Sequence, residues 1–294
     1  MSKRHFLDSG AFSLFNKVLK KQDTTGRLDY SVYNKPEFWK YVDAYANFIN
    51  RHKYSIDHYV NVDACRNPKL SWQIQKYLEE EHGLKPIPVV HFNTPIKWLA
   101  KYLDAGYDYI GIGGRVKRLP YWPWADRVFN EICNQQSRLP LCKTHGFAVT
   151  THKHVVRYPW YSVDSVTWKK MSYYGQILVP PVRGGQFCFS IPNQVVFIDP
   201  HGSKYTNRGT GRGRHFLHLS KPRQKEIRDW LDFIKVPFGK SKGDGSIIKP
   251  GVINDNAMRC AATISYFEHL QRSIPKWPWP FQVLHRPTLL EAIR

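Results

Sequence analysis

The sequence predicts an α/β protein, a (β/α)8 barrel of the TIM type followed by a basic, partly helical C-terminal extension. Short apolar runs alternate with stretches of helical periodicity over residues 4–165. Repeated strand and helix units of this kind are typical of parallel strands joined by crossover helices. Polar residues follow most of the apolar runs, and in a barrel such positions meet at one mouth. An open, doubly wound sheet would spread them along a crevice, so the pattern favours the barrel.

The elements of the first half follow in order. The expected strands are 5–8, 57–63, 88–92, 107–114, 145–150 and 160–164. The expected helices are 36–51, 70–81, 95–103 and 124–135. The aromatic and aliphatic residues of the first helix recur at the spacing of one buried face. Pro68 and Gly83 mark the start and the end of the second helix.

The second half is less regular. Residues 175–180 are the expected seventh strand, and 186–199 has the pattern of a hairpin that either supplies the eighth strand or decorates the barrel. The eighth strand is therefore unassigned. Residues 1–200 are expected to form the barrel domain, and residues 201–294 the basic extension. The elements expected in the extension are a helix over 222–234 with Ser220 as its cap, a loop at 240–246, a helix over 255–272 and an extended tail at 274–282.

The charge is strongly positive, because 44 Lys and Arg residues stand against 23 Asp and Glu, a net charge of +21. Such an excess costs self-repulsion unless an acidic partner offsets it, so a phosphate polymer is the expected partner. The residues expected to contact phosphates are Arg208, Arg212, Arg214, Lys221, Arg223 and Lys225. The alternatives are a solvated linker for this segment, and a basic but merely soluble protein for the whole chain.

Cysteine spacing and hydropathy limit the compartment and the metal chemistry. The 5 cysteines contain no CxxC pair, which favours free thiols in a reducing compartment. The N-terminal MSKRHFLDSG has no apolar signal core, and no run approaches the length of a membrane span. The expectation is a cytoplasmic protein with no membrane partner and no required metal. The two histidines of THKH (151–154) lack a third ligand and are expected at the surface or against phosphates.

Two carboxylates each end an apolar strand and precede a serine, Asp8 in LDSGAFS and Asp164 in YSVDSVTW. Two acids that face each other across a pocket can divide the work of a displacement at a sugar. One attacks the sugar carbon, and the other manages a proton on the leaving group. The alternative is that each acid caps a helix, since Asp-Ser at a strand end is also a capping signature.

Several motifs resemble one enzyme family. DSGAF (8–12) resembles the DSGGF motif of the tRNA-guanine transglycosylases, barrel enzymes that exchange a guanine for a 7-deazaguanine without breaking the strand. Three segments follow in the order of that family: VDAC (62–65), IGIGG (110–114) and GFAVT (146–150). RYPWYSVDSVTW (157–168) resembles the phage and bacterial branch of the superfamily, which places 7-deazaguanines in DNA. The resemblance covers roughly residues 5–200.

The resemblance implies a role for each acid. Asp164 would be the nucleophile at C1′ and would form a covalent sugar–enzyme intermediate. Asp8 would bind the base edge and shuttle the proton that the departing guanine needs and the incoming deazaguanine loses. Asp63 would accept hydrogen bonds from the amino and ring N–H groups of the base, and His91 stands where the tRNA enzymes have a glutamine. The remaining base-binding residues implied by the resemblance are Ser9, Gly113 and Gly114, the glycines because their backbone can approach the base.

Aromatic residues near the expected mouth would offset the cost of taking a base out of its stack. Base stacking on an aromatic ring contributes about 1 to 3 kcal/mol. The candidates are Trp122, Trp124, Tyr158, Trp160 and Trp168, with Trp122 and Trp160 foremost. The alternative for each of them is packing in the core beneath the loops.

The sequence therefore predicts a pentosyltransferase, a DNA-guanine transglycosylase with no cofactor beyond a 7-deazaguanine base as co-substrate. Its partners would be guanine-containing DNA, the free base and other phage or host modification enzymes, in the host cytoplasm if a phage encodes it. The CxCxxC…H zinc motif of the tRNA enzymes does not occur in the sequence, which disfavours the rival tRNA-guanine transglycosylase. Two further alternatives are a non-catalytic nucleic-acid-binding barrel that serves a partner enzyme, and a glycosylase that hydrolyses the bond.

Overall fold

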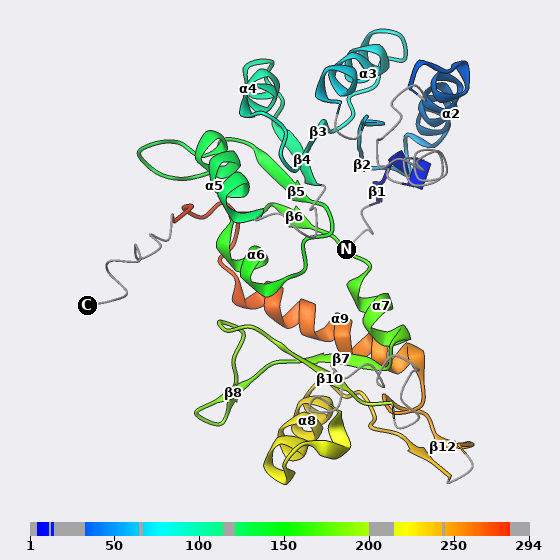
Figure 1. Cartoon of the computed structure of the whole chain (residues 1–294), viewed down its shortest axis with the longest axis vertical. Coiled ribbons are helices and arrows are strands. Elements are labelled where there is room, and N and C mark those ends of the chain that lie inside the picture. The colour runs from blue at the N-terminus through cyan, green and yellow to red at the C-terminus, as the bar shows by residue number, and fades with distance from the viewer. Residues whose placement is uncertain are drawn as a thin grey trace, which may run out of the picture. The chain divides into compact units, whose positions relative to one another are not determined.

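The computed structural model describes residues 5–11, 13–14, 33–64, 67–113, 121–199, 215–242 and 245–282, without the side chains of 121–122 (Figure 1). By its contacts the chain divides into two compact units, and each is described by itself. Unit 1 consists of Met1–Phe147, Pro159–Val163 and Pro278–Arg294. Unit 2 consists of Ala148–Tyr158 and Asp164–Trp277. Over the described residues no helix has both the length and the apolar character needed to cross a membrane.

Unit 1 is built on parallel strands that follow one another in sequence order. Four of them form one parallel sheet in the order β3 (Val89–His91), β4 (Tyr109–Gly113), β5 (Lys143–Gly146) and β6 (Ser162–Val163). Two more form a parallel pair, β1 (Phe6–Leu7) and β2 (His58–Tyr59). A parallel bridge between Val60 and Ile87 joins the end of β2 to the segment that leads into β3. The six strands predicted in this half are confirmed, although all of them are shorter than expected.

Contacts between side chains of distant strands show that the strands are curled. The ring of Phe6 on β1 stacks on the ring of His145 on β5 with centroids 4.3 Å apart. Tyr109 on β4 lies 5.4 Å, centroid to centroid, from His58 on β2, and its hydroxyl is 2.7 Å from the hydroxyl of Ser162 on β6. In a flat sheet β1 and β5 would lie about 19 Å apart. The strands therefore curve around a shared interior.

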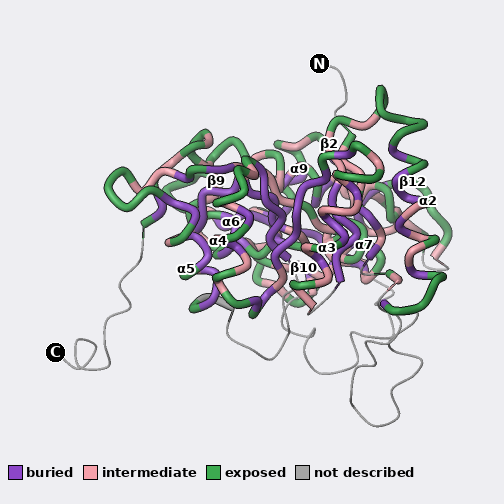
Figure 2. The backbone as a smooth tube through the Cα atoms, turned by 90° about the horizontal axis from the view of Figure 1, so that it is seen from above, coloured by how far each residue is buried: buried purple, intermediate pink, exposed green. Residues whose placement is uncertain are grey.

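Four helices lie outside these strands: α2 (Pro36–His52), α3 (Pro68–Glu80), α4 (Ile96–Asp104) and α5 (Tyr121–Ile132) (Figure 1). All four were predicted within a few residues of these bounds. Val42, Ala46 and Ile49 of α2 are buried, and the tube through the helices alternates between buried and exposed positions (Figure 2). Burial of one apolar face explains why their periodicity was visible in the sequence.

Unit 2 combines short helices with antiparallel strands. Its helices are α6 (His152–Arg157), α7 (Thr167–Tyr173), η3 (Phe216–His218), α8 (Lys221–Phe233) and α9 (Asn256–Ser273). The helices α8 and α9 are confirmed. Asp255 caps α9 by accepting hydrogen bonds from the amides of Ala257 and Met258, whereas Ser220 stands at the N-cap of α8 without a capping side-chain bond.

The strand pairing of unit 2 corrects two predictions. The strand predicted at 175–180 is present as β7 (Gln176–Val179), but its pairing among the described residues is antiparallel, with β10 (Gln194–Phe197). Residues 186–199 do not form a hairpin by themselves, because β9 (Gln186–Phe187) pairs back with β8 (Val182–Arg183). Between these two strands stand consecutive glycines with φ of 56° and 77°. Positive φ at both central residues is what a tight two-residue hairpin turn requires, so the chain reverses there.

The two units defined by packing have other boundaries than the two domains predicted from composition, 1–200 and 201–294. The strands β7 to β10 precede residue 200, but they belong to unit 2 together with α8 and α9. The reason is that α9 packs on β7 and α7, a contact that composition does not register. The functional roles expected for 1–200 and 201–294 stay predictions.

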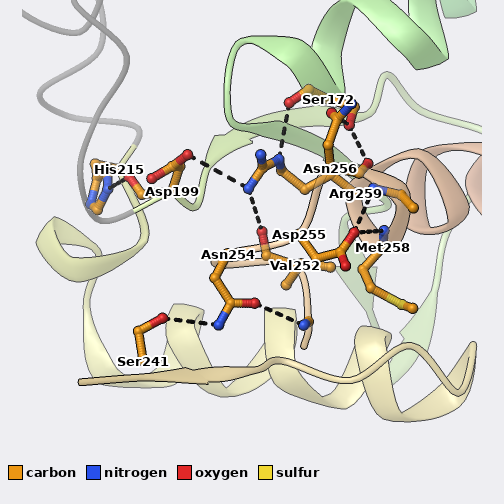
Figure 3. A network of polar contacts seen from close by, with 12 residues as sticks. Ser172, Asp199, His215, Ser241, Val252, Asn254, Asp255, Asn256, Met258 and Arg259 are labelled. Carbon is orange, nitrogen blue, oxygen red and sulfur yellow. Dashed lines mark hydrogen bonds and ion pairs between the residues drawn. The ribbon is translucent and has the colours of Figure 1, made fainter. Parts of the chain in front are cut away.

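A buried arginine connects the parts of unit 2. The side chain of Arg259 on α9 donates hydrogen bonds to the carbonyl of Ser172 at 2.9 Å and to that of Val252 at 3.1 Å (Figure 3). Its guanidinium also lies 3.6 Å from the carboxylate of Asp199. Burial lowers the pKa of Arg259, while the negative charges of Asp199 and Asp255 raise it. The guanidinium thus joins α7, the end of β10 and the turn before α9.

Candidate functional site

Asp63 and His91 form an ion pair after neighbouring parallel strands. Nε2 of His91 contacts the Oδ2 carboxylate oxygen of Asp63, and the two side chains are 19% and 9% exposed. Asp63 follows β2, and His91 is the last residue of β3. Nδ1 of His91 is buried, and no described atom forms a hydrogen bond with it. The pair therefore joins a carboxylate to a ring whose second nitrogen is buried.

The loop that carries Asp63 is fixed to α3. The hydroxyl of Ser71 accepts a hydrogen bond from the amide of Ala64 at 3.0 Å. The side chain of Asn61 donates to the carbonyl of Ser71 at 2.9 Å, and Asn67 caps the helix at the amide of Leu70. Because both sides of Asp63 are held, its carboxylate has a defined direction.

Replacement of Asp63 is expected to reverse the shift of the His91 pKa. Burial lowers this pKa, but the charge of Asp63 and its hydrogen bond together raise it by more. The pKa of His91 therefore lies above its usual value of 6.5. The stabilisation by the pair is therefore fully present below pH 6.5 and is lost as the pH rises through the higher folded-state pKa. In Asp63→Asn the charge is gone, so burial should bring the His91 pKa below its usual value.

An NMR titration of the histidine ring protons measures both values, and His91→Gln assigns the signal by its loss. A His91 signal that titrates at the same pH in the wild type and in Asp63→Asn would contradict the role given to the pair. The stability advantage of the wild type over Asp63→Asn should also shrink as the pH rises through the pKa of His91 in the folded wild type.

Asp8 and Ser9 stand between β1 and a helical turn. Asp8 is exposed, and its Oδ1 accepts a hydrogen bond from the amide of Gly10 at 3.3 Å. The carbonyl of Gly10 accepts the first bonds of the turn from Ser13 and Leu14, so Gly10 and not Asp8 occupies the N-cap position. Ser9 is 2% exposed and its hydroxyl lies 3.4 Å from the amide of Ala11, so it is a buried turn residue.

Two tyrosines of α2 border Asp8, and sequence reasoning missed them. The hydroxyl of Tyr41 donates to the carbonyl of Ser9, and that of Tyr45 donates to the carbonyl of Val60 at 2.8 Å. Burial raises the pKa of both phenols, and the charge of Asp8 raises it further. Their spacing of four residues places them on one side of α2, which is the signal that could have identified them.

Asp164 is exposed and lies in unit 2. Its Oδ1 accepts a hydrogen bond from the amide of Ala148 at 2.8 Å. Ala148 has φ of 56°, a left-handed conformation that alanine rarely adopts and that is found more often at functional sites. The N-cap of α7 is Val166, so Asp164 does not cap that helix. Asp8, by contrast, belongs to unit 1.

The glycines of β4 make room for Phe147. A Cβ atom at Gly111 would lie 2.7 Å from Cε2 of Phe147, and one at Gly113 would lie 3.3 Å from its Cβ. The carbonyl of Gly113 accepts a hydrogen bond from the amide of Phe92 at 2.6 Å. Packing is therefore a reason for these glycines that the sequence-based interpretation did not include. Gly114 lies outside the described residues.

The aromatic residues divide into buried and exposed ones. Trp160 is 5% exposed and packs edge-on against Phe129, so the expectation that it stacks on a base is corrected to a core position. Trp124 and Tyr158 are buried as well, at 3% and 0% exposed. Trp168, on α7 just after Asp164, is 37% exposed. The side chain of Trp122 is not among those described.

Of the six cations expected to contact phosphates, Arg208, Arg212 and Arg214 lie outside the described residues. Arg223 contacts Glu226 and the side chain of Gln194, so it connects α8 to β10. Lys225 forms a surface ion pair of 2.8 Å with Asp229, and such pairs contribute little to stability. Lys221 is exposed at the start of α8.

The histidines of the THKH segment are not at the surface. His152 and His154 are 4% and 5% exposed, and Nε2 of His152 lies 2.8 Å from the carbonyl of Phe189. The expectation of surface positions is therefore wrong, because α6 turns both rings into the interior of unit 2. In the part of the chain that the structure describes, no three His, Cys, Asp or Glu side chains are grouped to hold a metal ion.

Comparisons with known proteins add no assignment. No protein-family model matches the chain, and neither a curated protein nor a solved structure is significantly similar to it.

Proposed function

We propose that this protein is a DNA-guanine transglycosylase, which exchanges guanine in DNA for a 7-deazaguanine derivative. The observation that carries the proposal is the pair of Asp63, which follows β2, and His91, at the end of β3, because a parallel bridge joins the ends of these two sheets. Asp8 follows β1, the strand parallel to β2. In a TIM-type barrel the loops after the strands form one mouth, where active sites lie. The barrel is part of this proposal.

The pair suits the edge of a guanine-like base. Such an edge offers an amino group and a ring N–H as donors next to a carbonyl oxygen as acceptor. The carboxylate of Asp63 would accept from these donors through Oδ1, the oxygen that His91 does not contact. A site with buried polar groups discriminates strongly, because an unsuitable base leaves them unpaired. Adenine, which reverses the pattern of donors and acceptors, should be rejected.

The exchange requires two displacements at C1′. A carboxylate oxygen of Asp164 attacks C1′, the bond from C1′ to N9 of guanine breaks, and the departing base takes a proton from Asp8. The incoming deazaguanine then loses its N9 proton to Asp8, and N9 attacks C1′ and releases Asp164. The atoms balance without a further reagent, and two inversions retain the configuration at C1′. Between the two displacements the DNA strand stays bound to the enzyme through the covalent bond between Asp164 and C1′.

The charge of the chain supports a nucleic acid as substrate. The net charge of +21 favours a polyanion. A duplex base must leave its stack before C1′ is accessible, at a cost of a few kcal/mol. The exposed ring of Trp168, on the helix that follows Asp164, is the described aromatic placed best to offset part of that cost.

The test is incubation of the protein with guanine-containing DNA and a free 7-deazaguanine base, followed by digestion and mass spectrometry of the nucleosides. The deazaguanine nucleoside should appear and guanine should be released in equal amount. A parallel reaction on tRNA separates the rival enzyme of the same chemistry. Abasic sites formed without free base would indicate a hydrolytic glycosylase. Tight DNA binding with neither product would indicate a non-catalytic binding protein and would overturn the proposal.

A further inference from the structure

An exposed hairpin in unit 2 takes no part in the proposed chemistry. It consists of β11 (Lys240–Ser241) and β12 (Ile247–Lys249), which pair antiparallel. The sequence predicted a loop at 240–246, so the observed pairing of its flanks is a correction. The register shifts between Lys240 and Ser241, which leaves Ile248 outside the paired positions. Irregularities of this kind redirect side chains and are frequent next to functional sites.

The neck of the hairpin is fixed by Asn254. Its side-chain amide donates to the hydroxyl of Ser241 at 2.9 Å (Figure 3). It also donates to the carbonyls of Lys240 and Lys249, both at 3.1 Å. Its Oδ1 accepts from the amide of Gly251 at 3.0 Å. One side chain thus holds both strands of the neck.

The backbone at the neck is also closely packed. Gly239 has φ of 95°, and a Cβ atom there would lie 2.9 Å from Cα of Gly251. Only glycine allows this approach without strain. The chain then passes from Asn254 to Asp255, the cap of α9. The hairpin is therefore mounted on the helix that carries the buried Arg259.

The hairpin itself faces solvent. Ile247 and Ile248 are 54% and 50% exposed, and the three lysines of the hairpin are exposed too. Over residues 240–249 the sequence has three lysines and one aspartate, Asp244, a net charge of +2. A fixed neck below an exposed basic and apolar ribbon is the arrangement expected of a binding element, because little ordering remains to be done on binding.

We propose that the β11–β12 hairpin is an arm that binds duplex DNA. A two-stranded ribbon fits the major groove, where lysines reach phosphates and apolar side chains contact thymine methyl groups. The choice of DNA rests on the proposed function, whereas the basic charge and the exposed isoleucines are independent of it. Lys240, Lys242 and Lys249 contact the backbone, and Ile247 and Ile248 contact base edges.

The test compares two variants of the full chain in an Asp164→Asn background, which prevents exchange. The arm variant replaces three lysines with glutamine: Lys240, Lys242 and Lys249. The control removes the same charge from exposed positions of unit 1, at Arg51, Lys53 and Lys85. Binding to a labelled guanine-containing duplex is measured by fluorescence anisotropy from 50 to 200 mM salt. Each lost phosphate contact makes the negative slope of log K against log salt shallower by about 0.9, so the slope of the arm variant should be shallower than that of the wild type by about 2.7.

An arm variant whose slope equals that of the control would overturn the proposal, as would a wild type that does not bind the duplex. A slope change on tRNA but not on duplex DNA would overturn the choice of DNA. Base exchange by the wild type with an unchanged slope in the arm variant would refute the arm alone. Arm-dependent DNA binding without any exchange would refute only the proposed function. Thermal unfolding of both variants checks that they remain folded.

Discussion

Asp164→Asn is expected to lower the rate of base exchange on the order of 10⁴-fold or more, the scale on which loss of a nucleophile or its partner acid acts in other enzymes. An amide oxygen does not form the ester with C1′ that the proposed mechanism requires. The substitution keeps the size of the side chain and an Oδ1 atom, which can still accept the hydrogen bond from the amide of Ala148. The loss should therefore be chemical and not structural.

The measurement is release of labelled guanine from DNA, together with a denaturing gel that detects protein bound covalently to DNA. The wild type should give the covalent species and Asp164→Asn should not. Asp232→Asn removes an exposed carboxylate from α8 of the same unit and serves as the control, with an unchanged rate. Exchange by Asp164→Asn at the wild-type rate would refute Asp164 as the nucleophile.

Arg259→Met is expected to destabilise unit 2 by about 3 to 5 kcal/mol. The substitution keeps an apolar stem in α9 but removes the donors that satisfy the carbonyls of Ser172 and Val252 (Figure 3). It also leaves Asp199 without the positive charge 3.6 Å away. The stability of Arg259→Lys should lie between those of the wild type and Arg259→Met, because an ammonium group keeps the charge but not the planar fork of the guanidinium.

Urea unfolding and hydrogen exchange of the α9 amides measure this effect. Arg272→Met, in the last turn of the same helix and exposed, is the control and should change stability by no more than about 0.5 kcal/mol. Equal protection of α9 in Arg259→Met and in the wild type would show that the network does not support the helix.

The elements of the first half were predictable because each carries a local signal. The apolar runs end at polar residues, and the helices begin at or next to a proline, as α2 does at Pro36 and α3 at Pro68. The capping carboxylate of Asp255 marked the start of α9 in the same way. The pairing of β7 was not predictable, because its partner β10 begins 18 positions further along the chain, and an apolar strand fits a parallel or an antiparallel neighbour equally well.

For the candidate site, the sequence by itself determined which residues carry chemical groups: the acids Asp8, Asp63 and Asp164, each at the end of a strand. Only the tertiary structure decided their surroundings. It paired Asp63 with His91, 28 positions away, and buried Trp160 beneath the surface where a base was expected. It also turned the neck of a presumed loop into a fixed hairpin through Asn254. The physical reason is that periodicity and capping are local, whereas ion pairing and burial depend on contacts that only the folded chain creates.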